Sequence, residues 1–216
     1  MQTTISTKSY PESDYLNVTD NTKLSHLISG LPVTNILGTM NQTIREIVYD
    51  SRKAGTDSLF VAIPGGNLDG GTFIKDAVAQ GASVFITQTP LDSLNELGLG
   101  SRDVTALHVE DSRKALSIVS ANFYHSPSER LALTGITGTN GKTTTAYILE
   151  ALFDAEGIGV IGTIDYHYDG KKFSAPVTTP ESLDLNRLLN EMIEEKIEKC
   201  VLEVSSHALH QSRVHD

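Results

Sequence analysis

The chain has 216 residues, of which 39% are hydrophobic and 20% charged, a composition typical of a globular protein that buries a sizeable core. Its formal net charge of −10 argues against a nucleic-acid partner, since such proteins usually present a basic face. The single cysteine, Cys200, excludes a disulfide framework and indicates a reducing compartment. No apolar segment is long enough to span a membrane or to act as a signal region, so we expect a cytoplasmic protein without membrane insertion.

The first part of the chain predicts a small α/β domain. Residues 1–22 are polar without periodicity and predict a loosely ordered arm. In residues 23–126, strand-like apolar runs alternate with helical patterns, which predicts a small α/β sheet. We expect helices at residues 24–28, 73–80 and 112–123, and strands at residues 44–49, 58–63, 82–87 and 104–109. Gly81 directly follows the second helix, at the position where glycine commonly ends one.

Residues 127–216 predict a second α/β block. Strands are expected at 131–136, 158–164 and 200–204, and Asp169-Gly170 predicts a hairpin. Thr179-Pro180 predicts the start of a helix, with Thr179 as its N-cap. An apolar stripe at helical spacing follows and is expected to be core: Leu185, Leu188, Leu189, Met192, Ile193 and Ile197.

The number of strands bears on whether this second block is complete. Nucleotide-binding sheets of this class usually have five or more strands, and only about three are predicted before Asp216. We therefore expect an incomplete domain rather than one that a partner chain completes.

Residues 137–144 read Thr-Gly-Thr-Asn-Gly-Lys-Thr-Thr and lie between the predicted strand 131–136 and a helical pattern. Strand, glycine loop and helix is the context of a phosphate-binding loop, in which backbone N–H groups and the helix N-terminus surround a phosphate. Lys142 supplies a charge for the β- and γ-phosphates, and the Thr143 hydroxyl can bind Mg²⁺. The common pattern has glycine at position 136, whereas this chain has Gly135; the alternative is a glycine-rich turn before an ordinary helix. The predicted ATP contacts are Gly138, Thr139, Asn140, Gly141, Lys142, Thr143 and Thr144.

Glu203 ends the apolar strand Cys200–Val204 and is predicted to be the second metal ligand. In open α/β sheets, nucleotides bind at the carboxyl ends of the strands, where an acid on a neighbouring strand can share Mg²⁺ with Thr143. The alternative is a strand-end glutamate exposed to water.

Polar side chains that follow these strands predict an anionic substrate. Ser205 and Arg213 are suited to hydrogen-bond an anion, and Thr178-Thr179 offers two hydroxyls at the expected helix start. His207 is more readily explained as a packed or capping residue than as a catalytic base.

Together these motifs resemble the Mur ligases, the ATP-dependent amino-acid ligases of peptidoglycan synthesis. The resemblance runs from about residue 24 to the last residue and is closest to the branch that adds the third amino acid of the peptide. Besides the phosphate loop, with its displaced glycine, the motifs are Asp50-Ser51-Arg52, Leu59-Phe60-Val61-Ala62, Asp69-Gly70, Thr178-Thr179-Pro180 and Glu203-Val204-Ser205-Ser206-His207.

The resemblance implies a UDP-substrate domain at residues 23–126 and the first part of a P-loop, parallel-sheet ATPase domain at residues 127–216, without the amino-acid-binding domain. It implies ATP and Mg²⁺ as cofactors, with Lys142 as the catalytic residue. The implied substrates are UDP-MurNAc-L-Ala-D-Glu and diaminopimelate or lysine, with no obligate protein partner. The implied substrate contacts are Tyr49, Ser51, Gly66, Asn67, Leu68, Thr178, Thr179, Ser205, Gln211 and Arg213.

Three alternatives remain at this level. A regulatory GTPase would carry an Asn-Lys-x-Asp base-reading motif, which the sequence lacks. A catalytically incomplete chain would bind UDP-substrate and ATP without turnover, and we expect this chain alone to be inactive. A ligase that adds D-Ala-D-Ala, or a folylpolyglutamate-like ligase, shares the loop but is disfavoured by the Asp-Ser-Arg and Thr-Thr-Pro motifs.

Overall fold

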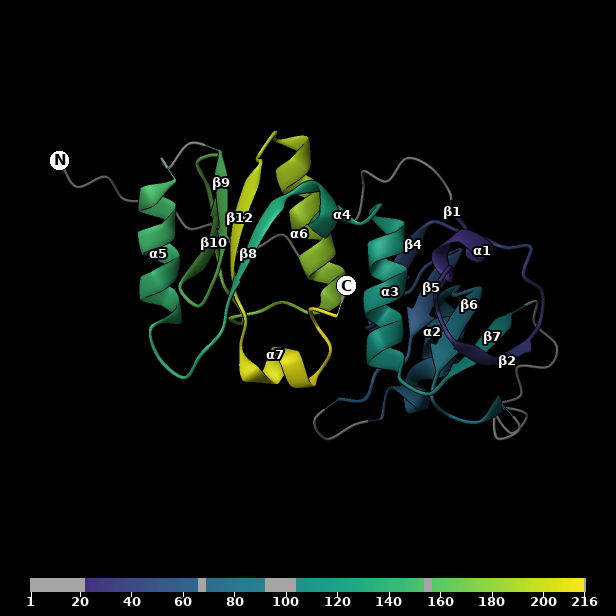
Figure 1. Cartoon of the computed structure of the whole chain (residues 1–216). Coiled ribbons are helices and arrows are strands. Elements are labelled where there is room, and N and C mark those ends of the chain that lie inside the picture. The colour runs from purple at the N-terminus through teal and green to yellow at the C-terminus, as the bar shows by residue number, and fades with distance from the viewer. Residues whose placement is uncertain (1–21, 66–68, 92–103, 154–156, 216) are drawn as a thin grey trace. The chain divides into compact units, whose positions relative to one another are not determined.

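The computed structural model describes residues 22–65, 69–91, 104–153 and 157–215 (Figure 1). These residues form two compact units, one within residues 22–125 and the other from Ser126 to Val214. The arm predicted for residues 1–22 lies outside the described residues except for Thr22. Each unit has its own sheet and its own buried core.

The first unit is built on a five-stranded sheet in the order β2-β7-β6-β5-β4. Four of these strands are parallel, and the edge strand β2 runs antiparallel to β7. The strands are β2 (Val33–Leu37), β4 (Glu46–Val48), β5 (Ser58–Val61), β6 (Val84–Thr87) and β7 (Thr105–Val109). A separate two-stranded ribbon pairs β1 (Thr22–Lys23) with β3 (Thr43–Ile44).

The helices of the first unit lie largely where the sequence predicts them. They are α1 (Leu24–Leu27), α2 (Ile74–Gln80) and α3 (Ser112–Phe123), with 3-10 turns η1 (Ser51–Lys53) and η2 (Gly70–Phe73). The predicted end of α2 is confirmed, since Gly81 has φ +119° and a Cβ there would lie 2.9 Å from Thr56 N. Only glycine adopts such a conformation without strain.

The prediction of one strand over residues 44–49 is wrong. Ile44 pairs with β1, and Glu46 begins the pairing with β5 in a different sheet. Between them, Arg45 N–H donates to the carbonyl oxygen of Asp57. Both pieces bury apolar side chains, so hydrophobicity alone does not reveal the break.

The second unit contains a five-stranded sheet in the order β11-β10-β9-β12-β8. The three predicted strands are confirmed as the parallel strands β8 (Ala132–Ile136), β9 (Ile158–Ile161) and β12 (Lys199–Glu203). The prediction that the second strand continues to residue 164 is wrong, because β9 ends at Ile161 and residues 162–164 form the turn before β10. An antiparallel hairpin of β10 (Asp165–Tyr168) and β11 (Lys171–Ser174) extends the sheet beside β9. The predicted turn is also confirmed: Asp169 and Gly170 have φ of +47° and +68°, as a two-residue hairpin turn requires.

Helices cover both faces of this second sheet (Figure 1). On one face, Ala146 of α5 (Lys142–Leu152) packs with Val201; on the other, Met192 of α6 (Ser182–Glu194) packs in a cluster with Cys200 and Leu202. Neighbouring residues of β12 thus face opposite helices, as the pleat of a strand requires. Burial raises the pKa of the Cys200 thiol to about 12, which fits an inert core residue. The short helices α4 (Pro127–Arg130) and α7 (Ser206–His210) complete the unit.

The predicted start of α6 is wrong, although its apolar stripe is confirmed as core. The helix begins at Ser182, and its N-cap residue is Glu181, whose side chain makes no capping bond. Thr179 is held elsewhere: its hydroxyl donates to the carbonyl oxygen of Glu203 at 2.8 Å and accepts from Ser205 N–H at 3.1 Å. These bonds fix Thr179 to the end of β12 rather than to the helix.

Candidate nucleotide and metal site

The glycine loop connects β8 to α5 at the carboxyl end of the sheet. Gly138 and Gly141 have φ of +151° and +83°, values that favour glycine, and Gly141 immediately precedes the first residue of α5. Lys142 Nζ donates to the carbonyl oxygen of Gly138 at 2.7 Å, so the ammonium lies against the loop. The helix α5 has 11 residues, and its N-terminus directly follows the glycine loop. This arrangement is suited to bind phosphate.

Glu203 meets Thr143 at the same end of the sheet. The register places Glu203 opposite Ile136, the last residue of the loop strand. The Thr143 hydroxyl donates to Glu203 Oε2 at 3.0 Å. The glutamate is 1% exposed, so it is not the solvent-facing strand end of the alternative interpretation.

Thr163 is a further contact of this carboxylate that the sequence interpretation missed. Its N–H donates to Glu203 Oε1 and its hydroxyl to Glu203 Oε2, both at 3.1 Å. A Cβ on the preceding Gly162 would collide with Glu203 Oε1, so glycine allows this close approach. Gly162 and Thr163 directly follow β9, which pairs with β12. Their place after a strand beside the Glu203 strand is the feature of the sequence that could have indicated this contact.

The donor chemistry of this site fits Mg²⁺. The ion prefers oxygen ligands and keeps several waters, so one hydroxyl and one carboxylate beside a phosphate loop match its usual protein ligands. Among the described residues, no group of three or more His, Cys, Asp or Glu is arranged to bind a metal, so a site made wholly by such side chains is not seen there.

The predicted substrate contacts of the second unit lie near this site, bonded to one another. Arg213 Nη1 donates to the carbonyl oxygen of Thr179 at 2.8 Å, and Arg213 Nε forms an ion pair with Glu181 at 2.9 Å. Gln211 Oε1 accepts from Arg213 Nη2 at 2.7 Å. Ser205 Oγ accepts from Ala208 N–H and caps α7. Arg213, expected to contact an anion, is therefore already paired with a carboxylate within the chain.

The predicted contacts of the first unit are described only in part. Gly66, Asn67 and Leu68 lie outside the described residues. Tyr49 follows β4, and Ser51 is buried at the start of η1. The preceding Asp50 accepts from the backbone N–H and the guanidinium of Arg52, and these bonds hold the pKa of Asp50 below its usual value. The Asp-Ser-Arg motif is thus a self-bonded turn that fixes Ser51.

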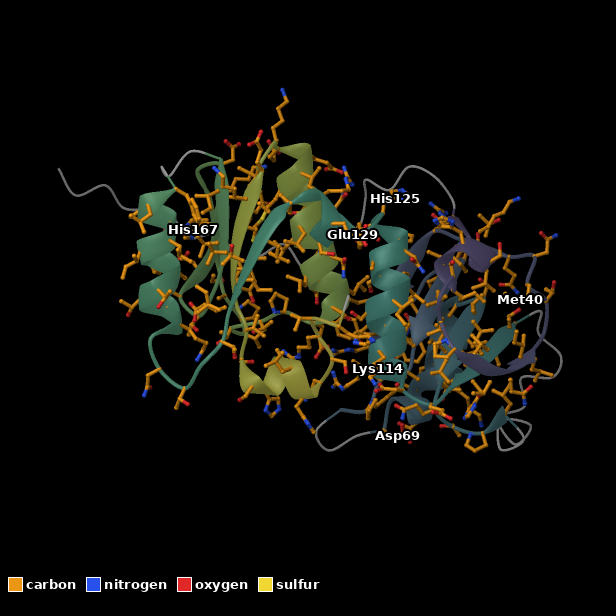
Figure 2. All side chains as sticks on the ribbon, in the orientation of Figure 1. Met40, Asp69, Lys114, His125, Glu129 and His167 are labelled. Carbon is orange, nitrogen blue, oxygen red and sulfur yellow. The ribbon has the colours of Figure 1, made fainter. Side chains whose placement is uncertain are left out.

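The sequence analysis also did not predict a second polar cluster, which lies between α5 and the β10–β11 hairpin. Figure 2 labels His167 of β10 in this region. His167 Nδ1 lies 2.5 Å from Asp165 Oδ1, and His167 Nε2 lies 2.7 Å from Glu150 Oε1. Lys172 Nζ pairs with Asp165 Oδ2 at 2.8 Å. The two ring nitrogens face different carboxylates, so this cluster links elements and does not converge on one ion.

A glycine loop between a parallel strand and a helix, with a buried acid on the adjacent strand, is the arrangement typical of P-loop nucleotide-binding domains. Comparison of the sequence with known protein families identifies the family. Residues 43–124 match the family described as "Mur ligase family, catalytic domain", and residues 136–216 match "Mur ligase middle domain". The chain belongs to the Mur ligase family.

Individual relatives agree with this family. The chain is 42% identical over 196 residues to UDP-N-acetylmuramoyl-L-alanyl-D-glutamate--2,6-diaminopimelate ligase 1 of Clostridium acetobutylicum, covering 89% of this chain and 39% of that protein. It is 42% identical over 195 residues to the corresponding ligase of Geobacillus kaustophilus, covering 89% and 38%. A solved structure of such a ligase superposes with a TM-score of 0.70 at 24% identity, covering 90% of this chain and 38% of that one, and supports the fold. The chain spans about 39% of the length of these curated relatives.

No helix among the described residues has both the length and the apolar composition needed to cross a membrane.

Proposed function

We propose that this chain binds ATP with Mg²⁺ and a UDP-muramoyl dipeptide, as part of a ligase that adds the third amino acid to a peptidoglycan precursor. The observation that carries the proposal is the convergence of the Thr143 hydroxyl and the buried Glu203 carboxylate beside the glycine loop. The names of relatives at 42% identity support UDP-N-acetylmuramoyl-L-alanyl-D-glutamate as acceptor and 2,6-diaminopimelate as the added residue.

In this proposal the chain's own groups bind and orient the two anionic reactants. Backbone N–H groups of residues 138–144 and the Lys142 ammonium surround the β- and γ-phosphates, and Lys142 stabilises charge that develops during transfer. Thr143 and Glu203 would hold Mg²⁺, which supplies charge neutralisation at the phosphates when bound. Because the protein has a formal charge of −10, concentrating cations at this one place is what allows anions to bind.

The chemistry needs an activated carboxylate. The D-glutamyl carboxylate oxygen attacks the γ-phosphorus, the bond to ADP breaks, and an acyl phosphate results. The amine of the third residue then attacks the acyl carbon, phosphate leaves, and the amine loses a proton to give the amide. Thr178, Ser205 and Gln211 are proposed to orient the muramoyl dipeptide, and Tyr49, Ser51 and residues 66–68 the UDP portion.

Binding measurements on this chain test the proposal. Titration with a fluorescent ATP analogue should show Mg²⁺-dependent binding, and Lys142→Ala should weaken it at least tenfold because the phosphates lose their charged partner. Thermal-shift measurements should show stabilisation by the UDP-muramoyl dipeptide and not by a folate. Stabilisation by the folate, without stabilisation by the UDP-muramoyl dipeptide, would contradict the assignment.

A chain that binds without turnover is the second candidate, favoured because the chain spans about 39% of its relatives' length. A phosphate-release assay with dipeptide substrate, ATP and diaminopimelate separates the two. Binding without phosphate release identifies the binding-only chain, and release above background identifies an active ligase.

A further inference from the structure

The Glu203 carboxylate is held by an unusual set of partners. It is buried, and its hydrogen-bond partners among the described residues are all neutral: the hydroxyls of Thr143 and Thr163 and the backbone N–H of Thr163. Neutral partners cannot balance the charge of a carboxylate, so a cation bound beside this side chain would be favourable. Thr163 supplies two of the three bonds and contacts both carboxylate oxygens.

We propose that Thr163 is the positioning residue of the metal site, which fixes the rotamer of Glu203 so that its carboxylate faces Thr143. This inference rests on the proposed function. Thr163 lies in the turn between β9 and β10, 40 residues before Glu203 in the sequence. We call the bonds from Thr163 to Glu203 the Thr163 clamp. Gly162 makes the clamp sterically possible, since any side chain there would meet Glu203 Oε1.

The clamp also connects the metal site to the substrate segment. Thr163 Oγ1 lies 3.1 Å from Thr178 Oγ1. Because the single hydroxyl proton of Thr163 is donated to Glu203, Thr178 must be the donor to Thr163. The hydroxyls thus form a directed chain from Thr178 through Thr163 to Glu203. Thr163 therefore orients one predicted metal ligand and one predicted substrate contact together.

The test separates metal affinity from nucleotide affinity. A fluorescent ATP analogue is titrated into the chain over a range of Mg²⁺ concentrations and again in EDTA. Thr163→Val removes the hydroxyl with little change in volume and should raise the half-saturating Mg²⁺ concentration roughly 10- to 100-fold, the usual effect of removing an outer-shell partner. Nucleotide affinity in EDTA should be unchanged, because the glycine loop is not altered.

Three further variants serve as controls. Thr163→Ser keeps both donors and should restore Mg²⁺ dependence to within about threefold of the unsubstituted chain. Gly162→Ala displaces the same carboxylate by a steric route and should raise the Mg²⁺ requirement like Thr163→Val. Thr134→Val, on the exposed face of β8, is the matched control and should behave like the unsubstituted chain. If Thr163→Val does not fold, as judged by circular dichroism, Thr163→Ala replaces it.

The failures of the two proposals are distinguishable. Folded Thr163 variants without a hydroxyl that keep the original Mg²⁺ dependence would overturn the positioning role while leaving the nucleotide site intact. Absence of Mg²⁺-dependent binding in the unsubstituted chain would instead overturn the proposed function, and the inference with it. An equal loss of affinity with Mg²⁺ and in EDTA would indicate general damage to the loop and would also contradict the positioning role.

Discussion

Thr179 shows how one buried hydroxyl can organise the approach to a site. It is 1% exposed, and its hydroxyl donates to the Glu203 carbonyl and accepts from Ser205 N–H, while its own carbonyl accepts from Arg213. The segment before α6, the end of β12 and the segment after α7 are thus joined at one residue. Its role is to hold the carboxyl end of β12, on which Glu203 lies.

Replacing Thr179 should therefore lower stability. Thr179→Val keeps the volume but removes the hydroxyl that bonds the buried Glu203 carbonyl and the part-buried Ser205 N–H, at a cost of about 1–3 kcal/mol in the free energy of unfolding. Urea denaturation measures this difference. Thr134→Val, at an exposed strand position, should change stability by no more than about 0.5 kcal/mol, and equal effects of the two variants would contradict the role of Thr179.

At the scale of elements, the hairpin and the P-loop helix are connected by hydrogen bonds of one side chain. His167 bridges Asp165, on its own strand, and Glu150 of α5, and the Tyr147 ring stacks on the imidazole with centroids 6.0 Å apart. Asp165 is buried, which raises its pKa, but the hydrogen bonds from Lys172 and His167 outweigh burial and hold the pKa below its usual value. The folded state therefore favours the ionised form of Asp165.

This direction of the shift predicts a pH dependence. The stability contributed by Asp165 is present above its unfolded pKa, near 3.9, and is lost as the pH falls through the lower folded value. Lys172→Met should thus destabilise the chain by roughly 1 kcal/mol at pH 7 and by much less once the pH is low enough to protonate Asp165 in the folded chain.

Urea denaturation at pH 7 and at successively lower pH provides the measurement. Lys171→Met is the matched control, since Lys171 pairs with Glu195 at a more exposed position and should contribute only a few tenths of a kcal/mol. A difference between Lys172→Met and the unsubstituted chain that does not shrink as the pH is lowered until Asp165 is protonated would contradict the assignment to Asp165.

At the scale of the whole molecule, the sequence predicts most of the architecture because buried parallel strands appear as continuous apolar runs. Strand β2 was missed because its residues are largely exposed and lack an alternating pattern. Glu203 and Thr143 could be paired in advance, since adjacent parallel strands end at the same edge. The Thr163 clamp could not, because it depends on the path of a turn 40 residues away and on contacts that no local motif encodes.

Two separate cores predict independent folding. The first unit buries Leu59, Phe60 and Ile86 within its own sheet and helices, so residues 22–125 expressed alone should unfold cooperatively in urea. Circular dichroism and a one-step denaturation curve would confirm this. A fragment without a cooperative transition would show that its core requires the rest of the chain.

The central claim is that Thr143 and Glu203 hold one divalent ion beside the phosphates of ATP. A crystal structure of this chain with Mg²⁺ and a non-hydrolysable ATP analogue tests it most directly. We predict an ion about 2.1 Å from Thr143 Oγ1 and from a γ-phosphate oxygen, with the Glu203 carboxylate bound to it directly or through one water. An ion that contacts neither side chain, or a nucleotide bound away from the glycine loop, would contradict the claim.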